Sequence, residues 1–296
     1  MVLQLAVQGL ATGASYALFA IGLVLVYQAT RTLNFAHGAL AVVGVLVALN
    51  LANGWGWNVI VASLAGVFCA GLLGAIAYIF FLGPLFRRSD STSLNGHLAA
   101  MLVTLGLLYI AQSVTLNVFG SEVRRFPNLF GSGEFHIGGA TIPSSYIGAM
   151  VCTVCLIIPL LAFIRYGRWG VAMRAASEKP EAAALMGVNT QILNPLVWGV
   201  GVAIAALAGI LVAPVAFVHI NMMEPVLIAA LAAATVGGLS NLGGAVIGAV
   251  VLGLVQSFTA YGLGPNAATI VTFLIIFGLL VLRPTGIIAE RQERVV

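Results

Sequence analysis

The feature that most constrains this chain is a series of long, continuous apolar runs, several of them about 20 residues in length. The 296 residues are 61% hydrophobic and only 7% charged, which is too little charge for the surface of a soluble protein of this size. Because the runs do not alternate apolar and polar residues, a transmembrane barrel is excluded. The sequence therefore predicts an all-α polytopic membrane protein.

The apolar runs predict eight or nine transmembrane helices within a single transmembrane domain that covers residues 1–296. The expected full spans are 5–27, 38–52, 59–82, 98–119, 144–164, 192–218, 245–261 and 267–282. A further Ala-rich segment, 225–239, is short for a full crossing and could be re-entrant. Residues 283–296 form a polar tail.

The distribution of basic residues predicts the orientation of the chain. Arg31, the pair Arg87 and Arg88, the connection 165–188 and the tail at 283–296 all fall on one side of the expected bundle. By the positive-inside rule this side is cytoplasmic, so the N-terminus is outside and the C-terminus is inside. Because the basic residues lie in connections between spans, the net charge of +4 indicates a bilayer and not nucleic acid.

Residues 165–188 form the main charged segment of the chain, and they end in a short amphipathic helix expected over 180–186. Glu181 suits the positive start of this helix, and Gly187 suits a left-handed stop. One interpretation is an interfacial helix that rests on lipid headgroups. The other is a knob gripped by a partner outside the bilayer. The residues expected to engage that partner are Arg174, Glu178, Glu181, Ala182, Ala183, Leu185, Met186 and Gly187.

Motifs for enzymatic chemistry are missing from the sequence. A phosphate-binding P-loop needs a lysine followed by Ser or Thr, whereas the single lysine, Lys179, precedes a proline. The four histidines lack the spacing of metal ligands, and no pairing of a nucleophile with a base is evident. We therefore expect no catalytic residue, cofactor or metal in this chain, and any ATP chemistry would belong to a partner.

Two motifs, in this order, resemble a known family. Asn34-Phe-Ala-His-Gly38 is similar to the turn after the first span of branched-chain amino acid permeases of the LivH/LivM type, and Glu181-Ala182-Ala183 with Gly187 resembles the EAA motif of bacterial ABC importers. Further similar stretches are Gly9 to Leu18, Thr104 to Gly106, Gly167-Arg168, Met173 to Ala175 and Gly237 to Leu239. The resemblance extends over nearly the whole chain and is closer to LivH than to LivM.

The resemblance implies a permease subunit of an ATP-driven importer in the bacterial inner membrane. In that family the EAA loop is a coupling helix seated on a cytoplasmic ABC ATPase, which binds the ATP and Mg²⁺. It also implies a substrate-binding protein outside the membrane, and either a second, LivM-like permease or a homodimer. The substrate would be a branched-chain or other hydrophobic amino acid, moved by alternating access.

Two alternatives remain open at the level of the sequence. Urea and short-amide permeases resemble the same family, and Ala229 here stands where members often carry a lysine. A different class is an ATPase-independent channel or secondary carrier. Such proteins usually couple ions through intramembrane charges, and the expected spans contain almost none.

Polar side chains inside the expected spans are candidates for a substrate pathway or gate, because such groups are costly in lipid unless they face a partner or water. They are Gln8, Tyr16, Thr104, Gln112 and Gln256. Asn34 and His37, which flank the turn between the first two spans, are candidates for an inner gate or a second contact with the motor. Hydrogen bonds between helices are the alternative for the amides, and for Asn34 it is capping of the following helix.

Charged residues on the outer side are candidates for docking a substrate-binding protein, because surface charge can steer such an encounter. They are Glu122, Arg124, Arg125 and Glu224. For Glu224 the alternative is stabilisation of a helix start. Two G-x-x-x-G pairs, Gly9 with Gly13 and Gly244 with Gly248, predict close approach of helix backbones.

Overall fold

The computed structural model describes residues 2–88, 94–131, 133–137, 140–178, 180–239 and 241–282. The tail at 283–296 lies outside the described residues. The helices are α1 (Val2–Thr30), α2 (His37–Gly54), α3 (Val59–Ala77), η1 (Tyr78–Leu82, a π-helical turn), α4 (Gly83–Arg88), α5 (Leu94–Phe119), α6 (Ser144–Tyr166), α7 (Arg168–Glu178), α8 (Pro180–Leu185), α9 (Thr190–Ala216), α10 (Glu224–Gly237), α11 (Leu242–Leu263) and α12 (Pro265–Leu282). The strands are β1 (Glu134–Ile137) and β2 (Ala140–Pro143).

The predicted class, an all-α polytopic membrane protein, is confirmed. Within the described part of the chain, seven helices are long and apolar enough to cross a membrane: α1, α2, the run Val59–Arg87, α5, α6, α9 and α11. Helix α10 has 14 residues, or about 21 Å at 1.5 Å per residue, against a hydrocarbon core of about 30 Å. The prediction that the segment at 225–239 is too short for a full helical crossing is therefore correct.

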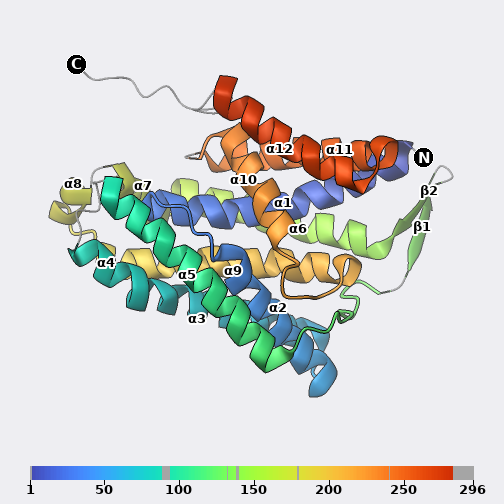
Figure 1. The fold of residues 1–296 in the computed structure, drawn as a ribbon, viewed down its shortest axis with the longest axis horizontal. Helices are drawn as coiled ribbons and strands as arrows, with labels where there is room; N and C mark the ends of the chain where they lie inside the picture. Colours follow the sequence, from blue (N-terminus) through green and yellow to red (C-terminus); the bar gives the residue numbers. More distant parts are fainter. Residues whose placement is uncertain are drawn as a thin grey trace.

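Helix α1 runs along the length of the bundle between the other helices (Figure 1). In its most apolar window 89% of the residues are buried, against 22% in α6. It packs against α9 and α11 above all, with further contacts to α6 and α10. The core of the protein is therefore built around its first helix, and α6 presents most of its surface to the surroundings.

Small residues allow the helix backbones to approach closely, as the two G-x-x-x-G pairs predict. A Cβ atom added at Gly9 or Gly13 would lie 2.9 Å from a backbone Cα atom of α11. Gly244 and Gly248 lie in the same way against the backbone of α10. Close packing between helices replaces the hydrophobic effect as the source of association in lipid.

Two crossings, those that include α2 and α10, begin with non-helical backbone inside the bundle. Residues 31–36 lead from α1 back into the bundle before α2 begins, and residues 217–223 do the same between α9 and α10 (Figure 1). In each case the residue after the long helix has a left-handed backbone, with φ 53° at Arg31 and 58° at Phe217. The starts of α2 and α10 consequently lie within the bundle and not at its ends.

The two ends of the bundle are built differently. Helices α4, α7 and α8 gather at one end, and the start of α1 lies near the hairpin of β1 and β2 at the other (Figure 1). The hairpin pairs Glu134 with Pro143 and Ile137 with Ala140 in antiparallel register. The sequence did not predict these strands, because the connection between the fourth and fifth expected spans reads only as a polar loop.

Candidate functional site

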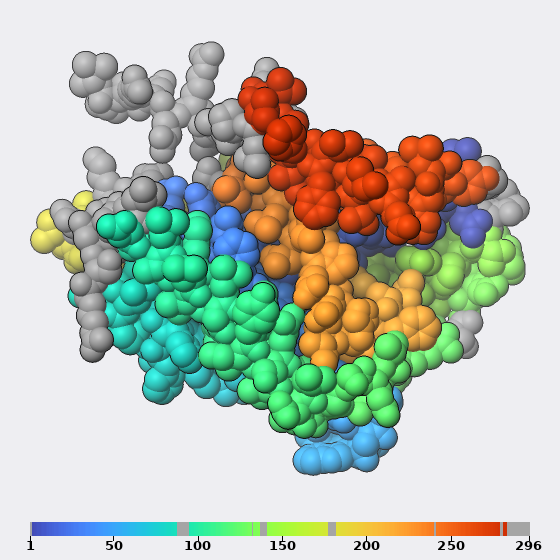
Figure 2. Space-filling model, in the orientation of Figure 1, coloured from blue at the N-terminus to red at the C-terminus, as the bar shows by residue number. Residues whose placement is uncertain are grey.

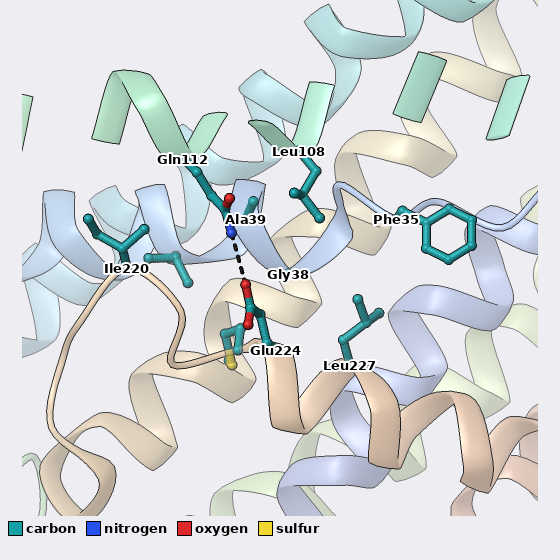
Figure 3. Close-up of a pocket in the computed structure, with 10 residues that line it drawn as sticks. Phe35, Gly38, Ala39, Leu108, Gln112, Ile220, Glu224 and Leu227 are labelled. Atoms are coloured by element: carbon teal, nitrogen blue, oxygen red, sulfur yellow. Dashed lines mark hydrogen bonds between the residues drawn. The ribbon is translucent and has the colours of Figure 1, made fainter. Parts of the chain in front are cut away.

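The starts of α2 and α10 meet beside α5 and form a cleft in the bundle (Figure 3). The cleft is narrow, with a volume of about 10 Å³, which is room for about one water molecule. The lining residues are Phe35, Gly38, Ala39, Val42, Leu108, Gln112, Ile220, Met223, Glu224 and Leu227. Figure 2 shows α5 in green beside the orange atoms of the α10 region, with blue atoms of the N-terminal part of the chain between them.

Gly38 lies directly against the residue that precedes α10. A Cβ atom at this position would lie 3.4 Å from both the Cβ and the carbonyl oxygen of Met223, which is ordinary van der Waals contact. Helix starts present backbone N–H groups that lack intrahelical partners, together with a partial positive charge. The cleft therefore lies where two such ends converge, the arrangement that discontinuous helices give transporters near the bilayer midplane.

The polar part of the cleft is a short hydrogen-bonded chain across two elements. The Gln112 amide nitrogen on α5 donates to Glu224 Oε1 at 2.9 Å and to Asn221 Oδ1 at 3.3 Å. Glu224 occupies the first turn of α10, where its carboxylate favours the positive helix start. The capping interpretation of Glu224 thus gains support, and the structure places its carboxylate against Gln112 in the cleft.

The segment before α2 is fixed by buried polar side chains. Asn34 Oδ1 accepts from the Ala36 backbone N–H at 3.0 Å, while Thr104 Oγ1 on α5 accepts from the Phe35 N–H at 3.4 Å. His37 is fully buried, its ring centroid 5.0 Å from that of Phe19, and neither ring nitrogen has a hydrogen-bond partner among the described residues. Asn34 and Thr104 hold the entrance of α2 in place, and His37 lies in packed interior.

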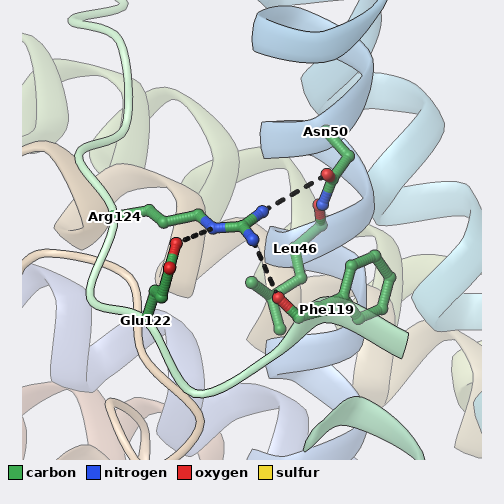
Figure 4. A network of polar contacts seen from close by, with 5 residues as sticks. All are labelled: Leu46, Asn50, Phe119, Glu122 and Arg124. Carbon is green, nitrogen blue, oxygen red and sulfur yellow. Dashed lines mark hydrogen bonds and ion pairs between the residues drawn. The ribbon is translucent and has the colours of Figure 1, made fainter. Parts of the chain in front are cut away.

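The segment before α10 is held by the outer loop. Arg124 and Val218 exchange backbone hydrogen bonds of 3.0 and 2.8 Å. The Arg124 guanidinium donates to the Phe119 carbonyl at 2.9 Å and lies 4.0 Å from Glu122 (Figure 4). The neighbouring Arg125 lies over the ring of Phe217, 5.9 Å from its centroid. The loop that carries three predicted docking residues is thus bonded to the strand-like segment that leads into the cleft.

A second candidate site is helix α8 at the end of the bundle. It stops in a Schellman motif, with bonds from Gly187 N–H to Ala184 O and from Val188 N–H to Ala183 O. Gly187 has φ 87°, so the predicted left-handed stop is confirmed. The side chain of Ala183 is buried, whereas Leu185 and Met186 are 89% and 86% exposed. The helix therefore presents two large apolar side chains outward.

The charged residues predicted to engage the partner do not all project outward as Leu185 and Met186 do. The Arg174 guanidinium donates to the carbonyls of Ile164 and Arg165, at 2.6 and 3.0 Å, and so stabilises the end of α6. Ala182 is exposed on the outer side of α8. Helical backbone is described for Glu178 and Glu181, but their side chains lie outside what the structure describes.

The remaining pathway candidates are not brought together at the cleft. Tyr16 donates to Gln256 Oε1 at 2.6 Å, and the Gln256 amide nitrogen donates to Thr272 Oγ1 at 2.6 Å. These two hydrogen bonds join α1, α11 and α12. This is the helix–helix role that the sequence left open. Gln8 is exposed on the first turns of α1 and does not line the cleft.

The walls of the cleft were missed from the sequence. They are apolar side chains such as Leu108, Ile220 and Leu227. In a chain that is apolar throughout, such residues cannot be distinguished by sequence from those that face lipid or pack between helices. Asn221, the second acceptor of Gln112, was also missed. The one usable signal was the polar stretch 219–224 before a short Ala-rich run, which marks an interrupted crossing.

The structure combines interrupted crossings, a cleft between them and the exposed helix α8 at the end of the bundle. Together these features define a membrane permease. The chain matches the family described as "Branched-chain amino acid transport system / permease component" over residues 5–282, and it belongs to that family. It is therefore a multi-pass permease of the ABC transporter type, not a catalytic subunit.

Several known proteins are similar to the chain. It is 30% identical to the high-affinity branched-chain amino acid transport system permease protein LivH of Escherichia coli (strain K12), covering 98% of this chain and 96% of the relative. It is 29% identical to BraD of Pseudomonas aeruginosa with the same coverage. Its fold is similar to that of a chain in the structure of PsaBC from Streptococcus pneumoniae in complex with Fab, with a TM-score of 0.51, 12% identity, and coverage of 94% and 91% of the two chains.

Proposed function

We propose that this chain is the membrane-spanning subunit of an ATP-driven importer for branched-chain or other hydrophobic amino acids. The observation that carries the proposal is the pair of exposed apolar side chains, Leu185 and Met186, on a helix that begins with the EAA motif. Two large apolar groups at the end of a membrane bundle favour a protein partner that covers them. An ABC ATPase is the partner that the family supplies.

The orientation follows from the same assignment. The end formed by α4, α7 and α8 would face the cytoplasm, and the β1–β2 hairpin with the start of α1 would face outward. The distribution of basic residues supports this orientation. The substrate-binding protein would then dock near Glu122, Arg124 and Arg125, beside the segment that leads into the cleft.

Transport would proceed by alternating access at the cleft. ATP binding would close the motor subunits, α8 would transmit the movement, and the cleft between α2, α5 and α10 would change the side on which it is open. The backbone segments 31–36 and 217–223 support this mechanism, because non-helical backbone inside a bundle is tolerated where it lines a cavity. A second permease, either a LivM-like subunit or another copy of this chain, would complete the pathway.

The coupling assignment is tested by changing the exposed face of α8. The double variant Leu185→Ser/Met186→Ser should lose copurification with the ATPase and reduce ATP-driven leucine uptake at least tenfold, without lowering the yield of folded permease. Leu263→Ser is the matched control, because Leu263 is also highly exposed and is the last residue of α11, a helix that does not take part in the end of the bundle formed by α4, α7 and α8. Retained ATPase and normal uptake in the double variant would refute the assignment. A wild-type permease that transports without any ATPase would favour the channel or carrier class.

A further inference from the structure

The cleft holds a carboxylate without a cationic partner. Glu224 accepts a hydrogen bond from Gln112, but no ion pair joins it to any Lys, Arg or His among the described residues. The other carboxylates of the chain lie in connections or in the tail. Glu224 is exposed at the cleft, and an acidic side chain within a membrane-spanning bundle that faces water in this way marks a substrate or ion pathway.

The depth of Glu224 follows from its partner. Gln112 lies seven residues before the end of α5 at Phe119, or about 10 Å along the helix. Glu224 therefore lies beside α5 about two helical turns before the loop that carries Glu122 and Arg124. A group at this position can contact a molecule that moves through the protein, whereas a docked protein would remain at the surface.

The surroundings of Glu224 are complementary to one ligand chemistry. Leu108, Ile220 and Leu227 form an apolar wall beside the carboxylate. Gly38 and Ala39, in the first turn of α2, line the same cleft, and such a turn attracts negative charge. Once the cleft widens during the transport cycle, a zwitterion with a primary ammonium group, a carboxylate and an aliphatic side chain would find a counterpart for each of its three parts.

We infer that Glu224 binds the ammonium group of the transported amino acid, with Gln112 holding the carboxylate in position. This inference rests on the proposed function and assigns the substrate-recognition residue within it. The ammonium would supply the positive charge that the protein leaves out. Urea and short amides carry no such charge, so the same residue would favour amino acids over them.

The test uses the permease assembled with its ATPase and binding protein in liposomes. At saturating binding protein, Glu224→Gln should reduce the leucine uptake rate at least tenfold, equivalent to about 1.4 kcal/mol, because the variant keeps the shape but loses the charge. Glu224→Asp, which keeps the charge, should retain more uptake than Glu224→Gln. Glu134→Gln removes an exposed carboxylate from the hairpin and should leave uptake within twofold of the wild type. Basal ATP hydrolysis reports that each complex is assembled.

A second measurement separates recognition from folding. Ligand-observed NMR at millimolar leucine, with the complex in nanodiscs and without binding protein, should show binding that Glu224→Gln weakens. 4-Methylpentanoate lacks the ammonium group, and its weaker signal should be unchanged by the substitution, with empty nanodiscs as background. Equal weakening of both ligands, or uptake by Glu224→Gln at the wild-type rate, would overturn the ammonium site and leave the importer intact. A wild-type complex that neither binds nor transports leucine would refute the proposed substrate and the site together.

Discussion

Replacement of Gly22 by Ala tests the claim that backbone contact between α1 and α9 stabilises the bundle. A Cβ atom at Gly22 would lie 2.5 Å from the carbonyl oxygen of Gly201 on α9. An ordinary contact needs about 3.4 Å, so the two helices must separate by about 1 Å, which forfeits a quarter to a half of each dispersion contact along the interface. Because the atom that is met belongs to backbone, no side chain can rotate to relieve the clash.

We expect Gly22→Ala to lower the free energy of unfolding by about 2 kcal/mol, within the range known for overpacked cores. The matched control is Gly106→Ala in the middle of α5, where an added Cβ would meet nothing within 4 Å. That substitution should stabilise the protein by about 0.5 to 1 kcal/mol, because Ala loses less conformational entropy in a helix. Both values are measured by reversible unfolding in mixed micelles, followed by far-ultraviolet circular dichroism. If the two variants differed by less than about 0.5 kcal/mol, the close-packing argument would be wrong.

Two further substitutions test single hydrogen bonds in the same assay. Tyr16→Phe should lower the free energy of unfolding by about 1 kcal/mol, since it removes the 2.6 Å bond to Gln256, whereas Tyr109→Phe on the exposed face of α5 should change it little. Asn58→Ala should cost about 1 kcal/mol through loss of the cap on the Ile60 N–H at 2.9 Å, and Asn58→Asp, which keeps an acceptor, should not. Equal effects within either pair would contradict the assigned bond.

The sequence predicts the membrane class and most helix positions well, because the apolar runs are long and are bounded by residues that favour turns. The stop at Gly187 and the shortness of the segment at 225–239 could both be predicted, since each depends on residues close in the chain. The strands β1 and β2 could not, because their four-residue pairing is set by a connection whose sequence lacks a clear alternating pattern.

The cleft could be predicted only in part. Gln112 and Glu224 each stand out as polar residues in an apolar chain, but their pairing joins positions 112 residues apart. That pairing depends on where α10 begins relative to α5, a tertiary relation with no local signal. The same limit explains Arg174, whose charge suggests an outward contact although its guanidinium is used to cap α6.

The non-helical segments that interrupt two crossings matter for function because only a few identifiable groups hydrogen-bond to them. Residues 217–223 leave the helical hydrogen-bonding pattern inside an apolar bundle, where each unpaired backbone group would be costly. The Arg124–Val218 bridge supplies backbone partners on one side of this segment, and the bond between the Gln112 and Asn221 side chains holds it near the cleft. A segment held by a few specific bonds can exchange them at less cost than a full helix can. We therefore expect the change of access to concentrate at residues 217–224, where the outer loop and the cleft are joined.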